Sequence, residues 1–260
     1  AEKLADTLAF VSAERKAAEL KKLLCGDAVT EVLLAHRAVI ASVIPEVAPC
    51  FDFPQNTPHH CYDVWEHTCR AVGNIAPEFI LRMAMLLHDS GKPACFSTDE
   101  TGIAHFHKHP AVSEKIAASV CALLKLSGAE TARITALVLE HDNRIPVTLP
   151  SVRRTLAKHG EEFFTQYLQV RNADTLAQSM YKRAEKLAEL ETLAQTAHTI
   201  LAQQSCLTLA GLAINGNDLT ALGLQGQEVG AALRKCLNAV LDGTAENTRE
   251  ALFALLKTAQ

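Results

Sequence analysis

The chain of 260 residues is poor in aromatic residues and has no excess of one charge sign. Aromatic residues make up 5% of the sequence, a content that suits a helical protein better than a β-sandwich or β-barrel. No apolar run approaches the roughly 18 to 20 residues that a membrane-spanning helix needs, so we expect no membrane segment. The net charge of −4 provides no global attraction to nucleic acid or to an anionic membrane, and any RNA contact must come from a local arrangement of charge.

The eight cysteines also lack a recognisable pattern. They are scattered, with no C-x-x-C pair and no signal-like start of the chain, which argues against a disulfide framework. We therefore expect reduced thiols in a cytoplasmic protein.

Helical periodicity is what the sequence does contain. Apolar residues make up 48% of the chain, alanine and leucine are abundant, and strand alternation is absent, so the predicted fold class is all-α. Three regions are expected: an N-terminal helical segment (1–49), a middle domain (50–180) and a helical tail (181–260). Predicted helices in and after the middle region cover 62–74, 78–88, 110–125, 130–139, 151–158, 161–173 and 175–204.

Six histidine and aspartate residues, two of them adjacent, occupy five positions at intervals of about one helix plus one loop. Each lies in a segment that is predicted to be a helix or a helix end. Side chains brought together from separate helices are how a bundle builds a metal site in its core. The predicted metal ligands are His67, His88, Asp89, His109, His141 and Asp174.

The pair His88-Asp89 gives the strongest signal. It follows the almost wholly apolar segment 81–87, which would deliver a carboxylate into the interior. An unpaired buried charge is very costly, and a bound cation is the simplest partner. Gly91 and Pro93 account for the end of this helix.

For some of the other predicted ligands, the sequence also allows a structural role without a metal. His67 shares an apolar helix face with Val64 and Ala71, where a lone histidine can also be an ordinary core residue. Asp174 could instead be an N-cap of the following helix. His105 and His107 are treated as accessory to His109, which directly precedes a proline and a helix start.

His67, His88-Asp89 and Asp174 together resemble the pattern of the HD-domain phosphohydrolase superfamily. His109 and His141 resemble its extended form, in which a second metal is held. The resemblance implies a helical bundle of HD-domain type with one or two divalent ions (Mn, Ni, Fe, Co, Zn or Mg) and a bridging, catalytic Asp89. It implies hydrolysis of a phosphoester, with the metal supplying an acidified water.

Cationic and polar residues near these positions are candidates for contacting such a substrate. Lys92, just after the His-Asp pair, is assigned a catalytic and substrate-binding role, and His60 and Arg144 are assigned substrate binding. The alternative for Lys92 and Arg144 is that each is a solvated surface charge.

A narrower resemblance is to the C-terminal part of bacterial tRNA nucleotidyltransferases, the CCA-adding enzymes. It covers nearly the whole chain in order. The polymerising head of that family has a Gly-Ser turn, paired metal-binding carboxylates and a Glu-Asp-x-x-Arg stretch, none of which occurs here. We therefore do not expect nucleotidyl transfer by this chain alone. The segments that carry the likeness are 12–24, 56–68, 87–93, 106–109, 173–174, 216–219 and 223–230.

The glycines of the tail leave two functions open. Gly216, Gly223, Gly226 and Gly230 are candidates for RNA contact through backbone amides, or they merely allow tight helix connections. One predicted function is a metal-dependent phosphatase or phosphodiesterase acting on nucleotide or RNA-end phosphates. The alternative is a non-catalytic, tRNA-binding body and tail of a CCA-adding enzyme.

Overall fold

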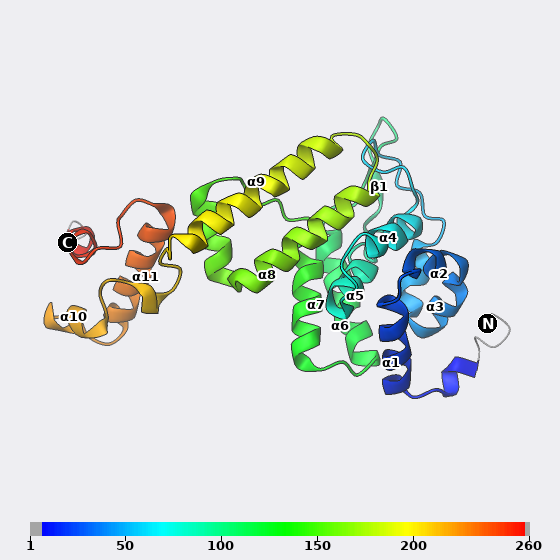
Figure 1. Cartoon of the computed structure of the whole chain (residues 1–260), viewed down its shortest axis with the longest axis horizontal. Coiled ribbons are helices and arrows are strands. Elements are labelled where there is room, and N and C mark those ends of the chain that lie inside the picture. The colour runs from blue at the N-terminus through cyan, green and yellow to red at the C-terminus, as the bar shows by residue number, and fades with distance from the viewer. Residues whose placement is uncertain (1–6, 258–260) are drawn as a thin grey trace. The chain divides into compact units, whose positions relative to one another are not determined.

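The computed structural model describes residues 7–257 and consists mainly of helices, which confirms the predicted all-α class (Figure 1). Within these residues, no helix combines the length and the apolar character that crossing a membrane requires. A hairpin of two-residue antiparallel strands, β1 (Ser97–Thr98) and β2 (Ala104–His105), is the exception to the helical pattern. Strands this short leave no alternation in the sequence.

The helices agree with the predicted ones to within a few residues in most of the middle region. In the predicted N-terminal helical segment, two short helices follow the first one. The α-helices are α1 (Ala13–Leu24), α2 (Val29–Ala35), α3 (Arg37–Val43), α4 (Val64–Gly73), α5 (Phe79–Leu87), α6 (His109–Leu123), α7 (Gly128–Glu140), α8 (Leu149–Ala177), α9 (Arg183–Ala202), α10 (Gly216–Ala221), α11 (Gln227–Asp242) and α12 (Arg249–Lys257). Short 3-10 helices cover Pro45–Cys50, Pro93–Cys95 and Leu209–Gly211.

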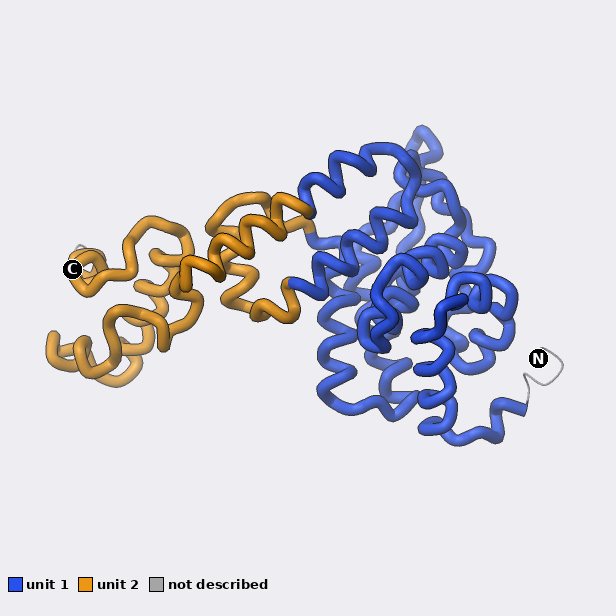
Figure 2. The backbone as a smooth tube through the Cα atoms, viewed as in Figure 1, with its two compact units in different colours: residues 1–143, 165–190 blue, residues 144–164, 191–260 orange. Residues whose placement is uncertain are grey.

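Two compact units make up the chain (Figure 2). The first contains the residues up to 143 together with 165–190, and the second contains 144–164 together with 191–260. The domain limits at 49 and 180 that the sequence suggests stay a prediction.

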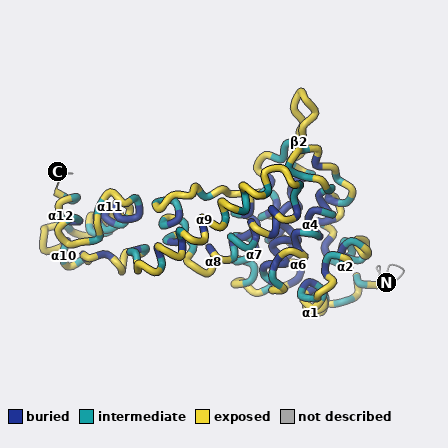
Figure 3. Tube along the Cα trace, turned by 45° about the horizontal axis from the view of Figure 1, so that its top comes forward, coloured by how far each residue is buried: buried dark blue, intermediate teal, exposed yellow. Residues whose placement is uncertain are grey.

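Helix α5 lies at the centre of the first unit. It packs against α1, α4, α6 and α7, and every residue from Leu81 to Leu87 is buried. Buried backbone positions gather around α4, α6 and α7 in Figure 3. Arg82 is buried among them because its guanidinium donates to the backbone carbonyls of Leu24 and Gly26, at the end of α1. The C-terminal end of α5 is thereby delivered into the interior of the unit.

Helix α8 corrects one expectation about Asp174. The two helices predicted at 151–158 and 161–173 are continuous except for a kink at Gly160, whose φ of 82° is left-handed. No glycine or proline follows until well past Ala177, so the helix continues and Asp174 lies in its last turn rather than at an N-cap. The N-cap alternative is therefore wrong, and α9 begins only at Arg183.

The tail residues of the second unit have a small core of their own. Ile214, Leu219, Cys236 and Leu252 are buried there, and they come from α10, α11, α12 and the segment before α10. Asn215 caps α10 through a capping box with Asp218.

Candidate metal centre

The structure brings the six predicted ligands together inside the first unit. Each comes from the position that its helix fixes: His67 from α4, the His88-Asp89 pair from the end of α5, His109 from the start of α6, His141 from the end of α7 and Asp174 from the last turn of α8. All six are buried, with exposed fractions from 0% to 7%. They form two groups that share Asp89.

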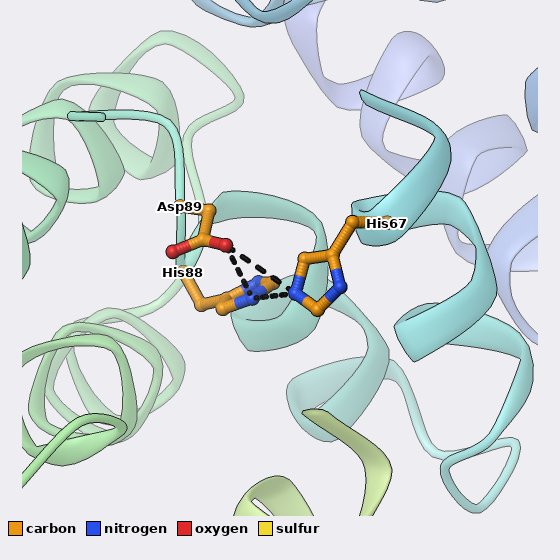
Figure 4. Close-up of side chains that lie close together, drawn as sticks. All are labelled: His67, His88 and Asp89. Atoms are coloured by element: carbon orange, nitrogen blue, oxygen red, sulfur yellow. Dashed lines mark hydrogen bonds and ion pairs between the residues drawn. The ribbon is translucent and has the colours of Figure 1, made fainter. Parts of the chain in front are cut away.

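The first group gathers around the Oδ2 atom of Asp89. This oxygen lies 3.4 Å from Nε2 of His67 and 3.1 Å from Nε2 of His88, and the two Nε2 atoms are 3.4 Å apart (Figure 4). Oδ1 of Asp174 completes the group at 3.0 Å from Nε2 of His67 and 3.9 Å from Nε2 of His88.

The second group gathers around the other oxygen of the same carboxylate. Oδ1 of Asp89 lies 3.2 Å from Nε2 of His109 and 3.6 Å from Nε2 of His141. These two nitrogens are 3.1 Å apart. Asp89 is therefore placed to bridge two sites, one through each oxygen.

These separations match the edges of a coordination polyhedron. A metal–ligand bond of about 2.1 Å places neighbouring ligand atoms about 3.0 Å apart at octahedral angles and about 3.4 Å apart at tetrahedral angles. The ligand atoms of each three-residue set, with His67, His88 and Asp89 in one and Asp89, His109 and His141 in the other, all lie within 4.8 Å of one another. An ion of first-row transition-metal size fits each set with little movement of the side chains.

Backbone carbonyls fix the orientation of all four imidazoles. A carbonyl oxygen can only accept, so the ring nitrogen facing it carries the proton. The Nδ1 atoms donate to the following carbonyls: His67 to Ala177 (3.3 Å), His88 to Met85 (2.6 Å), His109 to Phe106 (2.9 Å) and His141 to Val138 (2.6 Å). In the neutral rings, each Nε2 therefore presents a lone pair to the centre of its group.

Three of these bonds have the same spacing in the chain, and two of them the same local cause. His88, His109 and His141 each donate to the carbonyl three residues earlier in the chain. His88 and His141 are the C-caps of α5 and α7, where the last carbonyls of a helix have no intrahelical partner. The helix end thus both supplies the acceptor and aims the ring.

The two buried carboxylates remain ionised. Burial alone would raise the pKa of Asp89, but the neighbouring positive charges, that of His88 when it is protonated and that of Lys92, hold it well below 3.8. The pKa of Asp174 is likewise lowered, because its contacts with His67 outweigh burial. The two groups together therefore offer a metal two carboxylate anions and four imidazoles.

A cation suits this arrangement better than the side chains alone do. Lone pairs on Nε2 of His109 and His141 face each other at 3.1 Å, and both also face Oδ1 of Asp89, at 3.2 and 3.6 Å. Such contacts repel unless a positive charge lies between them. A mixed imidazole and carboxylate set suits Mn, Fe, Co, Ni or Zn more than a calcium cage.

Lys92 is not the solvated surface charge that the sequence left open. Its side chain is 6% exposed, and its Nζ lies 2.7 Å from Oδ2 of Asp89, outside hydrogen-bonding geometry. The same ammonium donates to Oε1 of Gln55 at 2.7 Å. The structure therefore holds a cation at the edge of the first group.

His60 packs edge-on against the ring of His67, with the ring centroids 4.8 Å apart. Burial and the charges of Lys92 and His67 lower the pKa of His60 to about 2. It is neutral at physiological pH and is restricted to hydrogen bonding and packing.

Several predicted residues lie outside the two groups. His105 instead bonds to Asp99 at 2.8 Å and stacks on His107. Arg144 is exposed and belongs to the second unit. The tail glycines also belong to that unit, and Gly223 and Gly226 have left-handed φ angles that explain the residue type without any RNA.

Sequence reasoning missed the residues that support the ligands. Gln178 donates to Oδ2 of Asp174 at 2.9 Å, and Arg171 donates to the carbonyl of His141 at 2.8 Å. Gln178 stands four residues after Asp174, one helical turn away, so a helix continuing past Asp174 would have revealed it. Gln55 lies in a loop, and no periodic signal indicates its contact with Lys92.

Comparison with known proteins gives a consistent family signal. The profile of a family described as tRNA nucleotidyltransferase domain 2, putative, matches residues 95–256. This range contains His109, His141 and Asp174, together with the whole tail up to α12.

Two characterised relatives are similar to the chain. An A-adding tRNA nucleotidyltransferase of Deinococcus radiodurans is 33% identical over 165 residues, which are 60% of this chain and 38% of that protein. A CC-adding tRNA nucleotidyltransferase of Thermus thermophilus is 31% identical over 258 residues, which are 95% of this chain and 57% of that protein. The chain thus matches less than two thirds of the length of each relative.

Proposed function

Because the chain belongs to the tRNA nucleotidyltransferase domain 2 family, we propose that it serves tRNA metabolism as a metal-dependent phosphohydrolase. The substrate class is a nucleotide or RNA-end phosphate, hydrolysed as a monoester or a diester. The observation that carries this proposal is the sharing of Asp89 between two sets of unprotonated imidazole nitrogens. The resemblance of these residues to the HD-domain pattern supports the same reaction class.

The ligands divide between two ions. One ion would be held by Oδ2 of Asp89 together with His67, His88 and Asp174. The other would be held by Oδ1 of Asp89 together with His109 and His141. Divalent ions bound there supply a nucleophile at neutral pH and Lewis acidity toward the phosphoryl oxygens.

The chain itself contributes orientation, charge and exclusion of water. The carbonyl bonds to Nδ1 keep all four rings in the tautomer that a metal requires. The low pKa of Asp89 keeps this carboxylate ionised over the whole physiological range. Lys92, held by Gln55, adds a cation that can contact a phosphoryl oxygen, as phosphoryl transfer requires.

The experiment combines metal analysis with an ester panel. We expect the purified chain to bind close to two equivalents of a transition metal and to hydrolyse at least one of p-nitrophenyl phosphate, bis-p-nitrophenyl phosphate, AMP or 2′,3′-cyclic AMP. Treatment with a chelator should abolish turnover, and one added metal should restore it. A chain loaded with two equivalents that leaves the whole panel intact would refute the hydrolase proposal.

A second candidate function is tRNA binding without catalysis, favoured by the names of both relatives and by the family match over the tail. We expect the chain to retain tRNA on a filter at 50 mM salt and to lose affinity steeply by 200 mM, because phosphate contacts release counterions. Retention should persist after chelation, since the metal groups would only support the fold. Absence of tRNA retention at low salt would rule this function out.

A further inference from the structure

A cavity of about 440 Å³ lies in the second unit, where the first turns of α8 meet the loop that follows α11. Its lining includes Arg153, Ser205, Thr244 and Glu246, and all of its lining residues belong to this unit. The volume is that of a small-molecule site and could hold a nucleotide-sized ligand. None of the predicted metal ligands contributes to it.

Arg153 is the unusual member of this lining. Its Nε atom is buried and has no hydrogen-bond partner within the part of the chain that the structure describes. The next residue, Arg154, instead makes two hydrogen bonds to the carboxylate of Asp242, at 2.8 and 2.6 Å. Although Nε itself is closed to solvent, Arg153 lines the cavity, and the planar fork of its guanidinium matches the oxygens of a phosphate group.

The loop that lines the cavity beside Arg153 is stabilised by hydrogen bonds that do not involve the guanidinium. Gly243 ends α11 with a left-handed φ of 72°, and a Cβ added there would lie 3.6 Å from Nη1 of Arg153. The amide of Asn247 is bonded on both sides, accepting from the backbone of Ala213 and donating to that of Gly211. The loop that faces Arg153 is therefore held in place without a ligand.

The second charged residue of the lining decides the chemical class of ligand. Glu246 presents a carboxylate, which repels a bare phosphate but accepts hydrogen bonds from hydroxyl groups. A ligand that carries a phosphate at one end and hydroxyl groups at the other satisfies both residues. A phosphorylated ribose has this composition.

We propose that this cavity binds a ribose phosphate unit, with the phosphate on Arg153 and the sugar hydroxyls on Glu246. The unit can be a free ribonucleotide or one nucleotide of an RNA chain, because both present the same groups. The site is additional to the metal groups and does not depend on the hydrolase proposal.

The test uses calorimetric titration of the full chain in a chelating buffer, so that no ion can recruit phosphate to the metal groups. The probes are ribose 5-phosphate, inorganic phosphate and a single-stranded RNA heptamer. Arg153→Gln should weaken the binding of every probe that binds the wild type by roughly 10- to 100-fold, the change expected for a lost charge-assisted hydrogen bond. Arg234→Gln, an exposed arginine of α11, is the matched control and should change binding less than twofold.

Glu246→Gln distinguishes the contribution of the sugar hydroxyls to the affinity from that of the phosphate. It should weaken ribose 5-phosphate several-fold while leaving inorganic phosphate equal or tighter, because the repulsion is removed. Ser205→Leu, which fills the cavity, should reproduce the loss if Arg153→Gln does not fold. The tighter of ribose 5-phosphate and the RNA heptamer identifies the source of the unit.

Two outcomes would overturn the proposal. One is equal affinity of Arg153→Gln and Arg234→Gln for every probe, including the case in which the wild type binds none of them at millimolar concentration. The other is a Glu246→Gln variant that weakens inorganic phosphate as much as ribose 5-phosphate, which would assign Glu246 a purely structural role.

Discussion

Asp89→Asn is expected to lose metal from both groups and to lower phosphoester turnover by roughly 10³-fold or more, as when a member of an interdependent catalytic unit is removed. Both oxygens of this carboxylate are used, Oδ2 with His67 and His88 and Oδ1 with His109. An asparagine offers one neutral oxygen, and its amide donors would face one of the imidazole sets. Metal content by elemental analysis and kcat on the best ester of the panel measure the two effects.

The chain provides a matched control for this variant. Asp142 follows His141 as Asp89 follows His88, but it is exposed and faces Arg171 at 3.6 Å. Asp142→Asn should keep its metal and its turnover within about twofold, since the Asp142 side chain is 56% exposed and belongs to neither metal group. His141→Ala should lose one ion and keep the other. If Asp89→Asn retained two equivalents, the bridging role would be wrong.

Gly91→Ala is expected to destabilise the chelated protein by about 1–3 kcal/mol, the usual cost of overpacking. A Cβ at this position would lie 2.7 Å from the backbone nitrogen of Ser113 and 2.8 Å from the carbonyl oxygen of His109. Both are main-chain atoms of α6, so the helix itself must move. Because α6 carries His109, the affinity of the second metal should also fall, by roughly 10- to 100-fold.

Denaturant unfolding of the chelated protein and metal titration measure these two effects. Gly128→Ala is the control, because a Cβ there meets nothing within 4 Å and the residue begins α7. It should leave stability unchanged or raise it by up to about 1 kcal/mol, since alanine restricts the unfolded chain. Equal midpoints for the two variants would contradict the close approach of α6.

The sequence was sufficient to predict the fold class, and it singled out six side chains that lie close together in the structure. Helical spacing places His67 on an inward face, and the apolar segment before His88 indicates a buried helix end. Both are local patterns that tertiary packing did not override. The two helices expected at 151–158 and 161–173 form one helix, with a kink at Gly160 in the gap between the two predicted ranges.

The remaining features depend on information that is not local. Whether Asp174 begins a helix or lies in the last turn of one depends on how far α8 continues, and a charged residue is compatible with both. The burial of Lys92 depends on Gln55, which lies 37 positions earlier in a loop. The lack of room for a side chain at Gly91 depends on α6, whose approach to that residue is a matter of tertiary packing.

The hydrogen bonds from imidazoles to carbonyls three residues earlier have a consequence for biogenesis. His88 and His141 are aimed by their own helix ends and His109 by the loop carbonyl of Phe106, but the Nε2 atoms meet only after α5, α6 and α7 have packed. A nascent or misfolded chain would present scattered histidines, and only the native form would take up ions in this stoichiometry. The number of metal ions bound per chain in a cell extract would then report the fraction of molecules that have folded.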